Sequence, residues 1–434
     1  MLRRFHENVQ GKEMILLINP GHDGSHKHAS HRSIHRDPPP MSLLYVAANY
    51  PNSEVEILDT HVSPAWKGIL RQTHDIEWIG ISVIIGQNLA NAREITKWCR
   101  KYKPGVKIVW GGVMPTVMPK EVKAEYAPDE IFTGRMDEDL IPAWELLGED
   151  FNKEQTPYYH MVMTSSGCPF SCSFCYKHSL PDGKAYKLRS TESVIEELEY
   201  MHSLTGTRVF TFGDDNLLIN KERAMAIFDY MKRRGWYAEE VIGHFNGLDT
   251  ELIDAMGGIV QTYIGSIESA SPRLQKLLNK AIDLEAVPGK LEALNQAGIA
   301  ANTPFIIGLP TETDSDLEYN WSFMEYIKTR APWVRAQAYL WFPLPNTLLT
   351  TYAEKEYNVD LHHPVSDYER ANFWVDENLD GREFRPWITP ERYEALYKYG
   401  TRFKDVFHYP GKRGPYVLDR VLRGEKIDLR GDLG

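Results

Sequence analysis

The sequence predicts an α/β protein in which a doubly wound, Rossmann-like domain precedes a partial (β/α)6 TIM-type barrel and a small helical cap. Two observations predict this class. Short apolar runs alternate with amphipathic segments along most of the chain, and a polar stretch at residues 148–157 divides the alternation in two. With 434 residues, the chain is long enough for two or three domains. We expect these domains at residues 1–150, 151–350 and 351–434.

The first domain is expected to hold five parallel strands, at residues 14–19, 55–59, 78–83, 106–110 and 130–133. In a doubly wound sheet the ligand lies outside the carboxyl ends of the strands, so the loops after these runs are candidate binding segments. Glycines there let a backbone approach a ligand closely, although they also serve plain turns. The candidate binding residues are Ser82, Gly111, Gly112, Thr116 and Gly134.

The second domain is expected to contain six βα units. Its strands are predicted at residues 160–164, 208–212, 241–245, 260–266, 300–307 and 334–341. Its first helix, at residues 193–204, has Ser193 and Glu196 placed as a capping box and ends at Gly206. Six units fit an open relative of the eightfold barrel, whose chemistry lies at the carboxyl ends of the strands. From about residue 358 the chain is rich in aromatic residues, which suits a helical cap closing the barrel and equally a small independent core or a dimer face.

Three of the four cysteines lie in one short loop that follows the first expected barrel strand. Cys168, Cys172 and Cys175 have CxxxCxxC spacing, and three such thiolates can bind three corners of an iron–sulfur cube while the fourth iron stays open. A structural zinc site closed by His178 is the alternative. A disulfide is disfavoured, because three clustered cysteines and the distant Cys99 suit a reducing, cytoplasmic setting.

Polar residues follow the other expected barrel strands where a ligand would bind. Asp214 and Asp215, after Gly213, are suited either to hold an ammonium group or to cap the next helix. Glu268 ends an otherwise apolar strand, where a carboxylate is costly without a partner. The remaining candidates at strand ends are Ser269, Ile307, Gly308 and Phe342.

These motifs resemble, in this order, those of the radical S-adenosylmethionine (SAM) superfamily. The resemblance covers the cysteine loop with Phe174, the segment Gly-Ser-Ile-Glu-Ser that ends at Ser269, the turn Gly-Leu-Pro-Thr-Glu that ends at Glu312, and the proline-rich stretch after Trp341. It implies that the three cysteines bind a [4Fe-4S] cluster and are therefore both metal-binding and catalytic residues. It also implies an external electron donor of the flavodoxin or ferredoxin type. It also implies that SAM is bound by Phe174, Gly213, Asp214, Asp215, Glu268, Ser269, Ile307, Gly308 and Phe342.

Residues 14–147 resemble the cobalamin-binding domain that precedes many radical SAM barrels, through Ile-Asn-Pro at 18–20 and Gly-Gly-Val-Met-Pro-Thr at 111–116. The resemblance implies cobalamin at Ser82, Gly111, Gly112, Thr116 and Gly134. The chain lacks the Asp-x-His-x-x-Gly motif of corrinoid domains that donate a lower ligand, and the usual acidic segment after the fifth strand is altered to Gly-Arg-Met-Asp-Glu. The histidines of residues 21–36 form either a metal or substrate site or a solvated loop.

The resemblance implies reductive cleavage of SAM. The reaction expected first is cobalamin-dependent methylation of a small-molecule natural product at an unactivated carbon or phosphorus. Two other reactions remain open, namely a radical rearrangement and transfer of the 3-amino-3-carboxypropyl group without a functional corrinoid. A different class is a non-catalytic iron–sulfur or zinc protein.

Charge and hydropathy argue against two kinds of partner, although the net charge leaves room for a local basic groove. The chain has 49 Lys and Arg against 60 Asp and Glu, a net charge of −11, which opposes a large nucleic-acid footprint. It has no apolar run of the ~18 residues that a membrane span needs. We therefore expect a cytoplasmic protein with no nucleic acid and no membrane among its partners.

Overall fold

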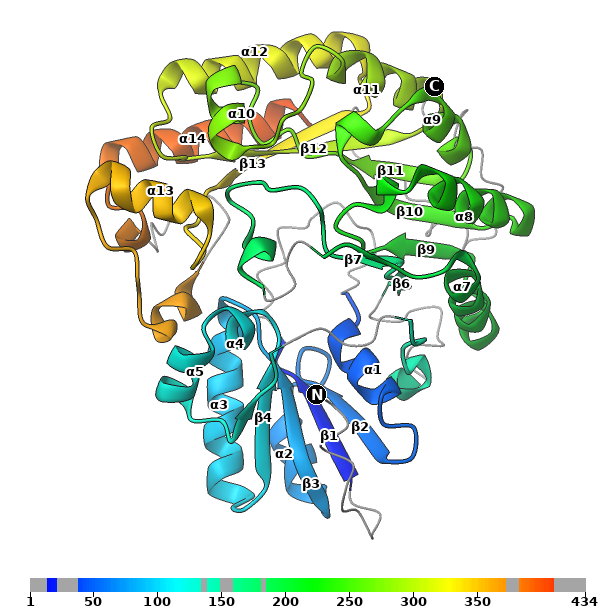
Figure 1. Cartoon of the computed structure of the whole chain (residues 1–434), viewed down its shortest axis with the longest axis vertical. Helices are drawn as coiled ribbons and strands as arrows, with labels where there is room; N and C mark the ends of the chain where they lie inside the picture. Colours follow the sequence, from blue (N-terminus) through cyan, green and yellow to red (C-terminus); the bar gives the residue numbers. More distant parts are fainter. Residues whose placement is uncertain are drawn as a thin grey trace. The chain divides into compact units, whose positions relative to one another are not determined.

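The computed structural model describes residues 14–21, 38–133, 139–148, 159–180, 185–371 and 382–409. The chain divides into two compact units (Figure 1). Unit 1 consists of Met1–His28, Pro40–Phe151 and His363–Ala371, and unit 2 of Ala29–Pro39, Asn152–His362 and Asn372–Gly434. Within the described ranges, no helix combines the length and the apolar character that crossing a membrane requires.

Unit 1 is built on a parallel five-stranded sheet in the order β2-β1-β3-β4-β5. The strands are β1 (Met14–Asn19), β2 (Glu54–Asp59), β3 (Ile76–Ser82), β4 (Lys107–Gly111) and β5 (Glu130–Ile131). The first five residues of β1 are all buried, as expected for a central parallel strand covered on both faces. The strand order reverses between β1 and β3, which is where doubly wound sheets bind their ligands. The predicted Rossmann-like class is confirmed.

The described helices of unit 1 before residue 149 are α1 (Met41–Ala48), α2 (Trp66–Gln72), α3 (Gln87–Tyr102), α4 (Val113–Val117) and α5 (Pro119–Tyr126), followed by the short 3-10 helix η3 (Trp144–Leu147). In Figure 1, α3 runs alongside the sheet of unit 1. Its buried residues Leu89, Ala92, Ile95 and Cys99 recur at helical spacing, so Cys99 belongs to the core face of this helix.

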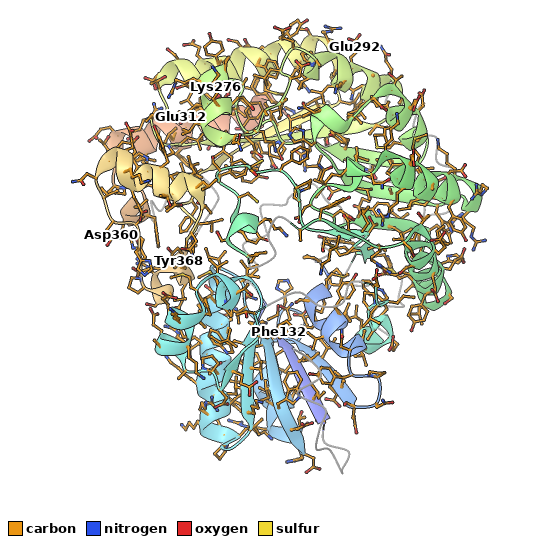
Figure 2. All side chains as sticks on the ribbon, in the orientation of Figure 1. Phe132, Lys276, Glu292, Glu312, Asp360 and Tyr368 are labelled. Atoms are coloured by element: carbon orange, nitrogen blue, oxygen red, sulfur yellow. The ribbon has the colours of Figure 1, made fainter. Side chains whose placement is uncertain are left out.

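Unit 2 is built on an open, parallel six-stranded sheet in the order β13-β12-β11-β10-β9-β6. The strands are β6 (Met161–Val162), β9 (Val209–Phe212), β10 (Tyr237–Ile242), β11 (Val260–Ile264), β12 (Ala300–Ile307) and β13 (Val334–Leu340). The main crossover helices are α7 (Thr191–Thr205), α8 (Lys221–Arg234), α9 (Thr250–Met256), α11 (Val287–Gln296) and α12 (Asp314–Arg330). They lie along the outside of the curved sheet, with side chains filling the space between (Figures 1 and 2). This is the partial barrel that the sequence predicts.

Two local details differ from the sequence-based expectation. The capping box at Ser193 is wrong, because α7 begins at Thr191 and the side chain of Ser190 accepts a hydrogen bond from the Ser193 N–H at 3.1 Å. Strand β10 spans Tyr237–Ile242 rather than residues 241–245, because the polar Glu239 hides its start from an apolar pattern and Phe245 begins a short 3-10 helix. The Glu239 carboxylate accepts a hydrogen bond from the Thr211 hydroxyl at 3.2 Å.

The described residues from Leu348 onward are largely helical and include several packed aromatic side chains. Helices α13 (Leu348–Tyr357) and α14 (Pro390–Val406) belong to unit 2, and α14 packs on β13. Trp387 stacks on Tyr357 with ring centroids 5.0 Å apart and lies 5.6 Å from the Trp341 ring. The intervening segment His363–Ala371 belongs instead to unit 1.

Candidate active site at the carboxyl ends of the strands

The cysteine loop leaves the sheet of unit 2 after β6 and is closed at its base. Strand β7 (Ser165–Ser166), just before the loop, pairs antiparallel with β8 (Lys187–Leu188), which follows it. Gly167 starts the loop with a φ of +74°, a conformation that glycine adopts without strain. Cys168, Cys172 and Cys175 are free thiols of intermediate exposure on this loop. The structure thus brings the three predicted ligands to the carboxyl end of the first barrel strand.

The middle of the loop is fastened to the end of helix α10 (Pro272–Leu278). The backbone N–H of Ser173 donates to the Leu278 carbonyl at 2.9 Å, and its hydroxyl donates to the Leu277 carbonyl at 2.8 Å. Phe174 packs against a buried cluster that includes Leu278 and Trp341. The aromatic residue before the third cysteine therefore anchors the loop.

The surroundings of the three thiols disfavour the ionised, thiolate form. Burial raises the pKa of all three, that of Cys172 to about 11, and neighbouring thiols contribute to the rise at Cys172 and Cys175. Lys280 opposes this shift at Cys168 and Cys172. A bound metal centre reverses the effect, because its charge stabilises thiolates. Three free thiols in one loop therefore fit a cluster held at three corners.

Among the described residues, no group of three or more His, Cys, Asp and Glu side chains is placed to hold a single metal ion.

The two adjacent acids after β9 have different environments. The carboxylate of Asp214 is 1% exposed and accepts hydrogen bonds from the Thr164 N–H at 3.0 Å, the Thr164 hydroxyl at 2.7 Å and the Ser165 hydroxyl. Burial raises the pKa of Asp214. Asp215, by contrast, is partly exposed and forms an ion pair with Lys177 at 2.9 Å, just beyond the third cysteine. Of the pair, Asp215 is the acid open to a ligand, while Asp214 holds the segment that leads into the cysteine loop.

Two buried arginines also hold the segment that leads into the cysteine loop. The sequence analysis singled out neither of them. Arg223, from α8, donates to the Thr164 hydroxyl at 3.0 Å and to the Arg189 carbonyl at 2.7 Å. Arg189 forms a fully buried ion pair with Glu197. No local pattern marked them, because an arginine in or before a helix ordinarily indicates a solvated face.

The loop after β11 carries a strained, buried acid. Glu268 has a φ of +64°, which is unusual for a residue with a side chain, and its carboxylate lies 3.3 Å from the Lys280 ammonium. Burial raises the pKa of Glu268, and Lys280 lowers it. Ser269 lies inside this loop and donates to the Asn320 side chain at 3.2 Å. Lys280 is therefore the charged partner that the buried Glu268 carboxylate needs.

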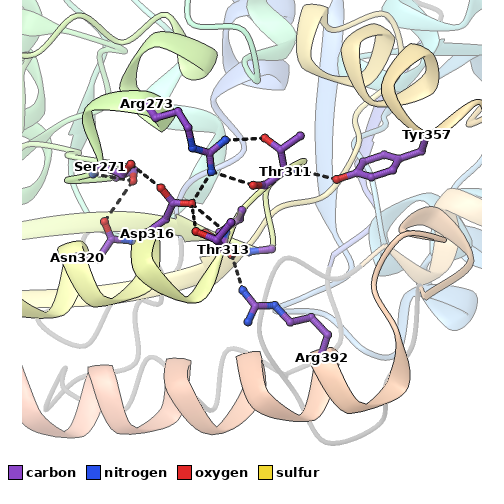
Figure 3. A network of polar contacts seen from close by, with 11 residues as sticks. Ser271, Arg273, Thr311, Thr313, Asp316, Asn320, Tyr357 and Arg392 are labelled. Carbon is purple, nitrogen blue, oxygen red and sulfur yellow. Dashed lines mark hydrogen bonds and ion pairs between the residues drawn. The ribbon is translucent and has the colours of Figure 1, made fainter.

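A polar network ties the loop after β11 to the turn after β12 (Figure 3). Arg273 donates to the Thr311 carbonyl at 2.8 Å and pairs with Asp316, which in turn accepts from the Ser271 hydroxyl at 2.6 Å. Asp316 also completes a capping box with Thr313 at the start of α12. The start of α12 therefore holds both the loop after β11 and the turn after β12.

The turn after β12 and the exit from β13 are tightly packed. Ile307 is fully buried, and Gly308 follows it with a φ of +72° and donates its N–H to Glu312 at 2.7 Å. A Cβ at Gly308 would meet a Leu340 methyl at 2.5 Å. Phe342 is buried against Phe384, with ring centroids 4.7 Å apart.

In unit 1, the predicted binding residues gather at the carboxyl ends of β3 and β4. Ser82 ends β3 and shares a hydrogen bond of 2.9 Å with the Ser42 hydroxyl. Gly111 ends β4, and its carbonyl accepts from the Val83 N–H at 2.7 Å. The Thr116 hydroxyl donates to the Gly112 carbonyl at 2.6 Å. Gly134 and the histidines of residues 22–35 lie outside the described residues.

Family comparison agrees with this division of the chain. Residues 162–320 match the radical SAM superfamily, and residues 29–138 match the B12 binding domain. An uncharacterised methyltransferase from Pyrococcus horikoshii is 34% identical over 330 residues, covering 72% of this chain and 67% of the relative.

Solved structures share the fold across both units. One is the radical SAM methyltransferase TsrM from Kitasatospora setae, solved with tryptophan and a SAM analogue. Its TM-score is 0.69 at 15% sequence identity, and the match covers 97% of this chain and 98% of that one. Another is the cobalamin-dependent SAM radical enzyme OxsB, solved with aqua-cobalamin and SAM, with a TM-score of 0.64, 15% identity, and coverage of 94% and 76%. The chain therefore belongs to the radical SAM superfamily, as an enzyme that carries a B12 binding domain ahead of its barrel.

Proposed function

We propose that this enzyme is a cobalamin-dependent radical SAM methyltransferase that methylates a small molecule of natural-product type. One observation carries the proposal: three free thiols share a fastened loop at the carboxyl end of the first barrel strand, in a chain whose first unit matches a B12 binding domain. Cys168, Cys172 and Cys175 would hold a [4Fe-4S] cluster, and the loops after β3 and β4 would hold cobalamin. When bound, these groups supply the electron that cleaves SAM and a carrier for the methyl group.

The residues of unit 2 suit the binding of SAM beside the cluster. Asp215 offers a partly exposed carboxylate for the SAM ammonium, with Lys177 as its present counter-ion. Glu268 and Lys280 form a buried pair of opposite charges near Cys172. Phe174, Gly213, Asp214, Ser269, Ile307, Gly308 and Phe342 would shape the surrounding loops. An external electron donor of the flavodoxin or ferredoxin type would reduce the cluster.

The metal content tests the cluster. We expect about four irons per chain after anaerobic reconstitution, since this spacing serves a cube with one open corner. Replacing Cys168, Cys172 or Cys175 with Ala should remove iron and SAM cleavage, whereas Cys99→Ala, the matched control, should leave both in place. Tightly bound zinc with little iron would instead favour the structural zinc class.

The nucleoside products test the reaction. Methyl transfer should yield S-adenosylhomocysteine together with 5′-deoxyadenosine, and both should depend on added cobalamin. A rearrangement would yield 5′-deoxyadenosine alone. Methylthioadenosine as the main product, with or without cobalamin, would reject methyl transfer in favour of 3-amino-3-carboxypropyl transfer.

A further inference from the structure

A short carboxyl-terminal segment is part of unit 1. The residues His363–Ala371, here called the strap, belong to unit 1, although the chain on both sides of them belongs to unit 2. The strap contains the 3-10 helix η7 (Val365–Arg370), which packs against α3 and α5. Tyr368, labelled in Figure 2, is 1% exposed. The strap lies outside the stretch that matches the B12 binding domain, which ends at residue 138.

Glu125 holds the start of the strap. Its carboxylate, near the end of α5, accepts hydrogen bonds from the Val365 N–H at 2.7 Å and the Ser366 N–H at 2.9 Å. These are the first amide groups of η7, which have no partner within the helix. A carboxylate at that position satisfies both groups with charge-assisted hydrogen bonds.

Glu369 joins the strap to both helices of unit 1. Its side chain is 10% exposed, accepts a hydrogen bond from the Tyr126 hydroxyl of α5 at 2.8 Å, and lies 3.2 Å from the Arg93 guanidinium of α3. Burial and the Glu369 carboxylate raise the pKa of Tyr126, so the phenol stays protonated as the donor. Tyr126 also stacks on Trp110 of β4, with ring centroids 5.0 Å apart. Trp110 immediately precedes Gly111.

The backbone of the strap holds the loop after β3. The Tyr368 carbonyl accepts from the Gly86 N–H at 3.0 Å. Gly86 has a φ of +77° and precedes α3, and a Cβ there would lie 3.2 Å from the Ala371 carbonyl oxygen. The same loop is joined to Gly111 through the Val83 N–H. The strap thus supports the two loops that carry Ser82, Gly111 and Gly112.

We propose that the strap supports the cobalamin site. Glu125 and Glu369 act as positioning residues that keep the loops after β3 and β4 in the shape that binds the corrinoid. The inference rests on the proposed function. A site whose binding-competent shape is only partly populated has a weaker apparent affinity, in proportion to that population. Loss of the strap contacts should therefore weaken cobalamin binding through the shape of the loops, and not through a lost contact between a glutamate and the cofactor.

The test compares Glu125→Ala, Glu369→Ala, Tyr126→Phe and the double variant Tyr126→Phe/Glu369→Ala in the full chain. The control is Lys97→Gln, which removes an exposed ion pair with Glu94 on the same helix α3. Hydroxocobalamin binding is followed by absorbance, and amide exchange of residues 83–92 by mass spectrometry. Iron content after reconstitution checks that unit 2 is intact.

We expect Glu369→Ala to raise the Kd for hydroxocobalamin roughly tenfold, as loss of a charge-assisted contact implies, and to speed exchange in the loop after β3. The double variant should bind no more weakly than Glu369→Ala, because both changes break one contact. Equal affinity in the wild type and all strap variants would overturn this inference alone. Failure of the wild type to bind hydroxocobalamin would overturn the proposed cofactor and the inference with it.

Discussion

Replacement of Gly112 by Ala should destabilise unit 1 strongly, because two loop backbones touch at this residue. Gly112 has a φ of +101° and a ψ of −166°, a region that is nearly exclusive to glycine and costs other residues about 1–3 kcal/mol. A Cβ would also lie 2.5 Å from the Val83 carbonyl oxygen and 2.9 Å from its nitrogen. The Val83 backbone could move away only by giving up its hydrogen bond to Gly111, which is worth about 1 kcal/mol.

These terms together predict a loss of about 2–4 kcal/mol in the free energy of unfolding of unit 1. Gly105→Ala is the matched control, because Gly105 has a similar φ of +90° but nothing within 4 Å of an added Cβ. It should cost only the backbone strain of about 1–2 kcal/mol. Urea unfolding, with amide exchange of β3 and β4 to assign the transition to unit 1, measures both variants. The reasoning is refuted if Gly112→Ala costs no more than Gly105→Ala.

Three further predictions concern the buried titratable groups. Asp214→Ala should lower the free energy of unfolding by about 3–5 kcal/mol, because it leaves three buried donors without their acceptor and removes the negative charge that acts on the buried Arg223. Asp215→Ala should cost less than about 1 kcal/mol, and calorimetry in which the two variants unfold alike would contradict this. Cys99 is fully buried whereas the three loop cysteines are of intermediate exposure, so iodoacetamide at pH 9 should modify the loop cysteines of the cluster-free protein and spare Cys99 until urea is added. Burial raises the pKa of Glu312 to about 8, so the folded chain keeps a proton there that the unfolded chain loses above about pH 4.5. Stability should therefore fall as the pH rises from about 4.5 to 8, and Glu312→Gln should flatten that part of the urea-midpoint profile; a slope that survives in the variant assigns it to another group.

The sequence by itself determined the class of each sheet and the location of the cysteine loop. β1 and β12 have the predicted bounds, because apolar periodicity is a local signal that neighbouring residues carry together. The spacing of the three cysteines is equally local, since one short loop holds them all. Residue spacing was therefore sufficient to predict the barrel and the domain before it, and to place the three cysteines in one loop after the first barrel strand.

Only the tertiary structure decided which polar residues are available to a ligand. Asp214 and Asp215 are equivalent in the sequence, but contacts with Thr164, 50 residues upstream, bury the first, while Lys177 pairs with the second. The strap likewise depends on Glu125 reaching amides 240 residues away. Such pairings follow from burial and from the need to satisfy every buried polar group, and those conditions are set by residues that meet only once the chain has folded.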